Sequence, residues 1–253
     1  MQYQNEIILT LTLIITYSSL LLFYRLLGKS GLYMWTVIAT ICANIEVMIL
    51  IEAFGLEQTL GNIMFASTFL VTDILSELEG KESANKAVKI GITTSISFIL
   101  ISQSWMLYIP TMQDWSMPFI KELFSNTPRL MFVGMLVYSL VQMFDVWLYH
   151  AIWKKTEQMF KDKRKGLWLR NNLSTITSQL INTALFTFFA FVGLYNFDTM
   201  LTIFFSSFII YVATSLLDTP VVYVARLLKD NDNNKKNTAL KKRMKKFKQL
   251  SSN

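Results

Sequence analysis

Amide, hydroxyl and carboxylate side chains recur at helical spacing inside long apolar stretches of this 253-residue chain. Gln142 and Asp145 are three residues apart, so they share one face of a helix. A second polar stripe follows steps of three, four, three and one residue, and consists of Asn172, Thr175, Gln179, Asn182 and Thr183. Amide groups present a donor beside an acceptor, which suits the edge of a planar nitrogen heterocycle.

Polar groups at hydrocarbon depth need a physical reason, because inserting an ionisable side chain there costs at least ~2.5–3.5 kcal/mol. A stripe that faced lipid would leave donors unsatisfied, so we expect it to face protein or a wet cavity. Hydrogen bonding between helices is the competing explanation, and we prefer it for Ser174, Thr175 and Thr187. The clustering of amides with Asp145 instead favours a substrate or gating role.

Covalent and metal chemistry find little support in the sequence. Cys42 and His150 are each the single residue of their type, which leaves no internal disulfide and no cysteine or histidine cluster for zinc. The chain contains no phosphate-binding loop, no dinucleotide fingerprint and no hydrolase or zinc-protease motif. We therefore expect no enzyme activity, no catalytic residue, no metal and no cofactor.

Composition indicates an integral membrane protein. Hydrophobic residues make up 53% of the chain, charged residues only 16%, and the mean hydropathy is +0.38. Such a chain lacks the polar residues that coat a soluble surface. Apolar runs that could each cross a bilayer lie at about 7–27, 32–54, 62–78, 87–109, 130–149, 173–195 and 200–228. The third is the shortest, and a re-entrant segment is the alternative there.

The predicted fold is therefore all-α: a polytopic helical membrane protein with about seven transmembrane helices. Residues 1–229 form the membrane domain, and 230–253 form a basic tail. Basic residues concentrate in the loops after the first, third and fifth runs and in this tail, whereas the opposite loops are mainly acidic. Positive charge stays on the cytoplasmic side, so the N-terminus is predicted outside and the C-terminus in the cytoplasm.

The tail accounts for the net charge of +7, since residues 226–253 hold ten Lys or Arg and two Asp. Basicity confined to a tail argues against direct nucleic-acid binding. Asp230 to Asn234 is predicted to break the last helix. Beyond it the sequence fits either a basic amphipathic helix on an anionic leaflet or a disordered basic tail. The apolar face of that helix would be Leu240, Met244, Phe247 and Leu250.

Three segments resemble a known family. The first runs from Ala43 through Phe69–Glu77, the second contains Arg129 and Gln142–Val146, and the third runs from Leu167 to Phe186. In order and spacing they are similar to the queuosine precursor transporter family, also called the vitamin uptake transporter (VUT) family. The resemblance covers about residues 30–228, so the first apolar run looks like an addition to a six-span core.

This resemblance implies a bacterial inner-membrane importer of 7-deazaguanine bases, namely 7-cyano-7-deazaguanine, 7-aminomethyl-7-deazaguanine or queuine, for queuosine salvage in tRNA. The implied partners are this small-molecule base and the lipid bilayer, with no direct contact to nucleic acid; the oligomeric state stays open. The family commonly has Asp where this chain has Asn182. An amide accepts one hydrogen bond and donates another where a carboxylate only accepts, so base preference or proton coupling could differ.

Residue pattern and resemblance together give ten candidate substrate-binding residues: Gln179, Asn182, Gln142, Asp145, Asp73, Arg129, Asn44, Ser174, Thr183 and Phe186. We predict that the base binds near mid-membrane between the third, fifth and sixth runs, with Phe186 or Phe144 against its face. The competing roles for Asp73, Asp145 and Asp218 are placement at the membrane interface or pairing with Arg170 or Arg226. Arg129 could likewise pair with an acid such as Asp73.

Two other functions compete with a self-sufficient carrier. One is a substrate-binding subunit of a multi-part ATP-driven vitamin importer, which would require an ATPase partner. The other is a membrane scaffold that carries a basic tail and transports nothing.

Overall fold

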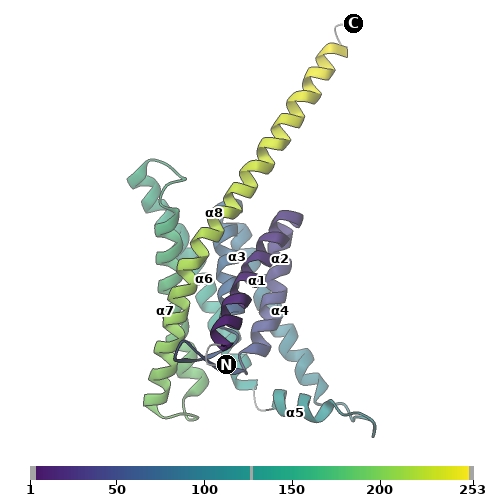
Figure 1. Cartoon of the computed structure of the whole chain (residues 1–253), viewed down its shortest axis with the longest axis vertical. Helices are drawn as coiled ribbons and strands as arrows, with labels where there is room; N and C mark the ends of the chain where they lie inside the picture. Colours follow the sequence, from purple (N-terminus) through teal and green to yellow (C-terminus); the bar gives the residue numbers. More distant parts are fainter. Residues whose placement is uncertain (1–3, 126–127, 251–253) are drawn as a thin grey trace.

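The computed structural model describes residues 4–125 and 128–250, with the helices arranged as a bundle (Figure 1). The long helices are α1 (Gln4–Leu27), α2 (Lys29–Glu46), α3 (Asn62–Glu79), α4 (Lys81–Trp105), α6 (Pro128–Phe160), α7 (Leu167–Phe191) and α8 (Phe197–Leu250). The smaller elements are β1 (Leu50–Ala53), β2 (Leu56–Thr59) and α5 (Met117–Ser125). Each of the seven predicted apolar runs thus has a long helix.

Helix α2 ends at Glu46 rather than near Phe54, which corrects the predicted second run. Residues 50–59 instead form an antiparallel hairpin in which Ala53 pairs with Leu56. Phe54 and Gly55 both have positive φ, at 56° and 69°, which is the geometry of a tight two-residue turn. Glu6 accepts a hydrogen bond from the Phe54 N–H at 3.1 Å, so the hairpin is tied to the start of α1.

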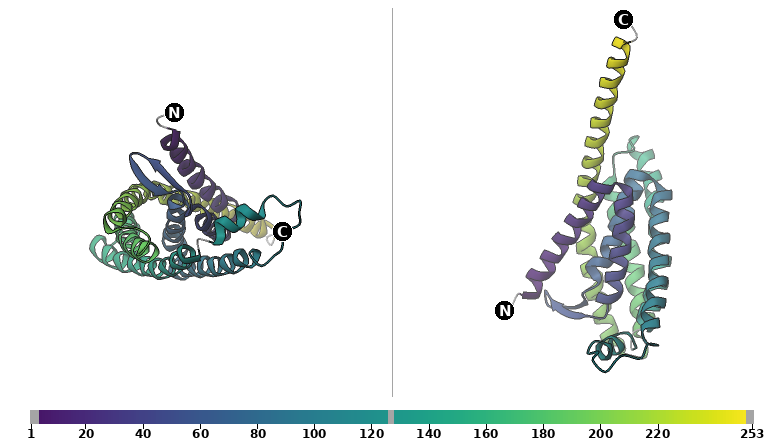
Figure 2. Two further views of the ribbon diagram at one scale, coloured as in Figure 1. Left: turned by 90° about the horizontal axis from the view of Figure 1, so that it is seen from below. Right: turned by 90° about the vertical axis from the view of Figure 1, so that its right-hand side faces the viewer.

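Helix α3 lies at the centre of the bundle. It contacts α1, α2, α4, α6, α7 and α8, and nearly every residue from Asn62 to Ser76 is buried. The main apolar core surrounds it and includes Leu20, Leu32, Leu70 and Leu75. Figure 2 shows the packed helices in two further views, with α5 at one end and the last part of α8 projecting from the other.

Among the residues that the structure describes, four helices are long and apolar enough to cross a membrane: α1, α4, α6 and residues 197–234 of α8. They expose large apolar side chains such as Ile14, Leu100 and Leu140, which a lipid environment would cover. Helix α3 and one face of α7 carry more polar residues, because neighbouring helices enclose them. In α7 the predicted stripe from Asn172 to Thr183 is buried while Leu173 and Leu180 are exposed, so the stripe faces protein.

The predicted helix break at Asp230–Asn234 is wrong, because α8 continues through it to Leu250. Asp and Asn weaken a helix interior by at most ~0.7 kcal/mol each. Two ion pairs also hold the start of this segment: Asp230 pairs with Arg164 at 2.8 Å, and Lys229 pairs with Glu79 at 3.0 Å. The predicted apolar face from Leu240 to Leu250 rests on side chains outside the described part.

Gly31→Ala should destabilise the turn between α1 and α2. A Cβ at Gly31 would lie 2.1 Å from the carbonyl oxygen of Phe23, a backbone atom that cannot rotate away. Overpacking of this kind costs ~1–3 kcal/mol. The measurement is thermal unfolding of the detergent-purified protein. In the control, Gly134→Ala, the new Cβ would make an ordinary 3.6 Å contact with Phe186 and improve helix propensity. Equal melting temperatures for the two variants would contradict this account.

Candidate functional site

A cavity opens in the half of the bundle that contains the hairpin. It lies among the C-terminal part of α2, the start of α3, the first half of α6, the second half of α7 and the first part of α8. Its volume is about 90 Å³. That is room for several water molecules or for part of a small ligand, and far too little for a peptide.

Three asparagines supply the amide groups of the cavity wall: Asn44 from α2, Asn62 from α3 and Asn182 from α7. The side-chain oxygen of Asn62 accepts hydrogen bonds from Thr59 at 3.1 Å and from Tyr211 at 3.0 Å. Its Nδ2 group has no partner among the described residues, so it is a buried donor available to a ligand. Asn44 donates to the carbonyl of Thr40 at 2.8 Å, which fixes the orientation of its amide.

Aromatic rings form the rest of the wall. The ring of Phe65 lies 6.0 Å from Tyr138 and 6.0 Å from Tyr211, and Phe186 lies 5.8 Å from Phe191. All five residues line the cavity. Rings combined with a few placed amides are the surface that binds a flat, polar-edged molecule by stacking and edge hydrogen bonds.

A buried glutamine lies next to the cavity, on the side towards the Glu77 end of α3. Gln142 on α6 is fully buried; its Nε2 donates to Thr68 at 2.9 Å and its Oε1 accepts from Thr72 at 3.2 Å. Thr68 lines the cavity, and Thr72 is the neighbour of Asp73. Gln142 therefore connects the cavity wall with the polar residues deeper in the bundle.

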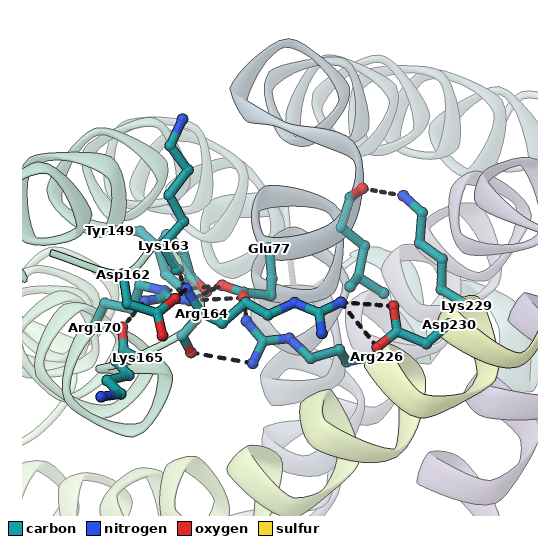
Figure 3. A network of polar contacts seen from close by, with 11 residues as sticks. Glu77, Tyr149, Asp162, Lys163, Arg164, Lys165, Arg170, Arg226, Lys229 and Asp230 are labelled. Atoms are coloured by element: carbon teal, nitrogen blue, oxygen red, sulfur yellow. Dashed lines mark hydrogen bonds and ion pairs between the residues drawn. The ribbon is translucent and has the colours of Figure 1, made fainter. Parts of the chain in front are cut away.

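An ion-pair network closes the end of the bundle opposite the cavity (Figure 3). Glu77 on α3 binds Arg170 on α7 through two oxygens, at 2.7 and 2.8 Å, and it also binds Arg226 on α8. Tyr149 on α6 donates to the same carboxylate at 2.8 Å. Glu77 thus joins four helices, and the guanidinium of Arg170 also stacks on Trp153 at 4.2 Å.

The candidates predicted from sequence divide among these levels. Asn44, Asn182, Thr183 and Phe186 line the cavity. The other interior candidates lie deeper and do not line it: Gln142, Gln179, Asp73, Asp145 and Ser174. Ser174 donates to the carbonyl of Arg170 on its own helix at 2.8 Å, so this bond does not join two helices as expected. Asn172 does join two, because it donates to Thr219 on α8 at 2.7 Å.

Two predicted arginine pairings are wrong. Arg129 caps the end of α7, donating to the carbonyls of Phe189 at 2.9 Å and Val192 at 2.8 Å, rather than pairing with Asp73. Arg170 and Arg226 pair with Glu77 rather than with the three aspartates. Both arginines pair with Glu77 because its carboxylate lies within reach of the two guanidinium groups at once.

Sequence reasoning missed several cavity residues, chiefly Asn62, Tyr138 and Tyr211. Asn62 is the first residue of α3 and of the third apolar run, so no polar residue one turn earlier on the same helix marked it as part of a polar face. The tyrosines look like ordinary apolar positions in the sequence. Their signal is visible only in three dimensions, where the hydroxyl of Tyr211 meets Asn62 and the Tyr138 ring packs over Gly91.

Comparison with known proteins adds independent information. The family model described as "Putative vitamin uptake transporter" matches residues 59–225. The "Probable queuosine precursor transporter" of Bacillus subtilis (strain 168) is 39% identical over 219 residues, which cover 87% of this chain and 93% of that protein. No solved structure gives a significant match.

Glu77→Gln should destabilise the closed end of the bundle strongly. The change leaves the buried guanidinium of Arg170 without a counter-charge, a loss of ~3–5 kcal/mol for a buried pair. Thermal unfolding in detergent measures it. Glu157→Gln is the matched control, because its partner Lys163 is 3.6 Å away, and water reaches both side chains. A Glu77 variant as stable as the Glu157 variant would refute the structural role of the network.

Proposed function

The chain belongs to the vitamin uptake transporter family, and on that premise we propose that it imports queuosine precursors, which are 7-deazaguanine bases, across a bacterial cytoplasmic membrane. The Bacillus subtilis relative is named for this class of substrate. The activity is transport rather than covalent conversion, and the base leaves the protein unchanged.

The cavity is the observation that carries the proposal. A 7-deazaguanine base has flat faces and an edge that both donates and accepts hydrogen bonds. The rings of Phe65, Tyr138 and Phe186 offer stacking surfaces, and Asn44, Asn62 and Asn182 offer amide groups of both polarities. Gln142 and Gln179, predicted contacts that lie below the cavity, would meet the base as it moves inward.

Import requires the cavity to open alternately to the two sides of the membrane. The cavity lies towards the end that charge distribution assigns to the outside, and the Glu77 network lies at the end assigned to the cytoplasm. The described conformation then corresponds to an outward-facing state. Release of the base inward would require Arg170 and Arg226 to separate from Glu77.

We also propose that all seven long helices cross the membrane, with the N-terminus outside and the tail after residue 229 in the cytoplasm. The turns after α1 and α3, the loop after α6 and the projecting part of α8 all lie at the Glu77 end of the bundle. Basic residues concentrate in these segments, including Lys29, Lys81 and Lys165. Their common side supports a cytoplasmic assignment.

A salvage assay tests the function. A bacterium that can neither make nor import queuosine precursors should regain queuosine in its tRNA when it expresses this chain and receives 7-cyano-7-deazaguanine, 7-aminomethyl-7-deazaguanine or queuine. Verified membrane expression without rescue by any of the three would reject the assignment.

Uptake by the purified chain alone in liposomes would exclude a required ATPase partner, whereas a stoichiometric ATPase complex needed for uptake would favour the alternative importer.

Asn182→Leu should reduce uptake by about tenfold or more at matched expression, because a ligand group would lose its buried hydrogen-bond partner. Initial uptake of a radiolabelled base in cells measures the effect. Ser97→Ala on the exposed face of α4 is the control and should transport normally. Equal rates for the two variants would remove Asn182 from the site.

Asn182→Asp, which restores the residue common in the family, should change the ranking of the three bases.

A further inference from the structure

Three aspartates occupy a level between the cavity and the Glu77 network. Asp73 comes from α3, Asp145 from α6 and Asp218 from α8, and each is at most 1% exposed. Asp73 lies within electrostatic range of the other two. Five of their six carboxylate oxygens have no hydrogen-bond partner among the described residues. The sixth belongs to Asp73 and accepts from Thr175 at 2.9 Å.

Unpartnered hydroxyl groups face this level from other helices. Ser178 on α7 lies beside Asp145, and Tyr17 on α1 lies beside Asp218. Both residues are at least nine-tenths buried, and neither hydroxyl makes a hydrogen bond of normal geometry within the described residues. A hydroxyl can donate a hydrogen bond to an ionised carboxylate and accept one from a protonated carboxyl, so it can serve both states of a neighbouring aspartate.

The neighbouring charges leave this level with an excess of acid. The charged groups around it are Glu77 on α3, Arg170 on α7 and Arg226 on α8, and both arginines are bound to Glu77. Four carboxyl groups therefore share two guanidinium groups, so two acids lack a counter-charge. A buried ionised carboxylate without a partner is strongly unfavourable.

Protons can remove that excess. A protonated carboxyl gains an O–H donor, which the oxygens of a neighbouring aspartate or of Ser178 and Tyr17 can accept. Within the described residues no group of three His, Cys, Asp or Glu side chains is placed to hold a metal ion, so the three carboxylates do not converge on one cation.

We propose that Asp73, Asp145 and Asp218 form a proton-binding site, centred on Asp145 and Asp218, that couples proton entry to movement of the base. The coupling part rests on the proposed transport function. A proton from the outer solution neutralises a carboxylate, and its release into the cytoplasm regenerates the charge, so each proton carries one positive charge inward. Gln142 connects the site to the cavity, since it binds Thr68 in the wall and Thr72 beside Asp73.

Infrared spectroscopy tests proton binding without any substrate. The full-length protein in D₂O near neutral pH should show the C=O band of protonated carboxyl groups, and Asp145→Asn and Asp218→Asn should each reduce it. Asp114→Asn is the control: the N–H of Met117 and the hydroxyl of Ser116 keep the pKa of this exposed loop carboxyl below its usual value, so it contributes no such band. A wild-type spectrum without the band, or a band that neither interior variant reduces, would overturn the site.

Proteoliposomes test the coupling. With radiolabelled 7-cyano-7-deazaguanine outside, an acidic exterior should accelerate uptake several-fold over equal pH, and Asp145→Asn should reduce that ratio to unity. Asp145→Glu should restore part of it, and Asp114→Asn should retain it fully. Uptake that ignores the gradient would overturn coupling. If no preparation takes up any of the three bases, the proposed function fails, and the infrared result alone decides whether the aspartates bind protons.

Discussion

Polar groups inside an apolar bundle must find their partners within the protein, and this constraint organises the whole structure. Glu77 satisfies it most completely, because one carboxylate binds Arg170, Arg226 and Tyr149 and so joins α3, α6, α7 and α8. The same requirement explains why α3 lies inside the bundle and why α7 turns its polar face inward, with apolar residues such as Leu173 and Leu180 on its outer face.

The constraint is met to different degrees at successive levels of α3. Thr68 belongs to the cavity wall, Asp73 to the aspartate level and Glu77 to the closed end, so one helix samples all three over a few turns. Partners are incomplete at the first two levels, whereas both carboxylate oxygens of Glu77 are bound at the third. Incomplete pairing is costly for stability, and it is expected where a protein must accept a ligand or a proton.

The sequence predicted the element order well, because apolar runs of sufficient length define helices. It also predicted that the α7 stripe faces protein, and the family resemblance it suggested is confirmed. It missed the β1–β2 hairpin, whose residues merge with an apolar run. It also interrupted α8 at Asp230, although Asp and Asn only weaken a helix and do not stop it as Pro does.

Site prediction succeeded only in part, for a physical reason. Asn44, Asn182 and Phe186 were identified because an amide or a spaced aromatic ring in an apolar run is conspicuous. Which level each residue occupies depends on helix register across the bundle, which one helix cannot reveal. Arg129 was therefore assigned to a ligand although it caps α7, and Tyr211 was overlooked although it holds Asn62 in place.

The continuity of α8 has a mechanical consequence. One helix carries Tyr211 at the cavity, Asp218 among the aspartates and Arg226 at the closed end, and it then extends by 20 residues, or ~30 Å, beyond Asp230. Pro220 lies between Asp218 and Arg226 and has no N–H, so the carbonyl of Leu216 lacks its helical donor. Because a proline is a preferred point of bending in a helix, a small change of angle at Pro220 would move the end of α8 through a much larger distance.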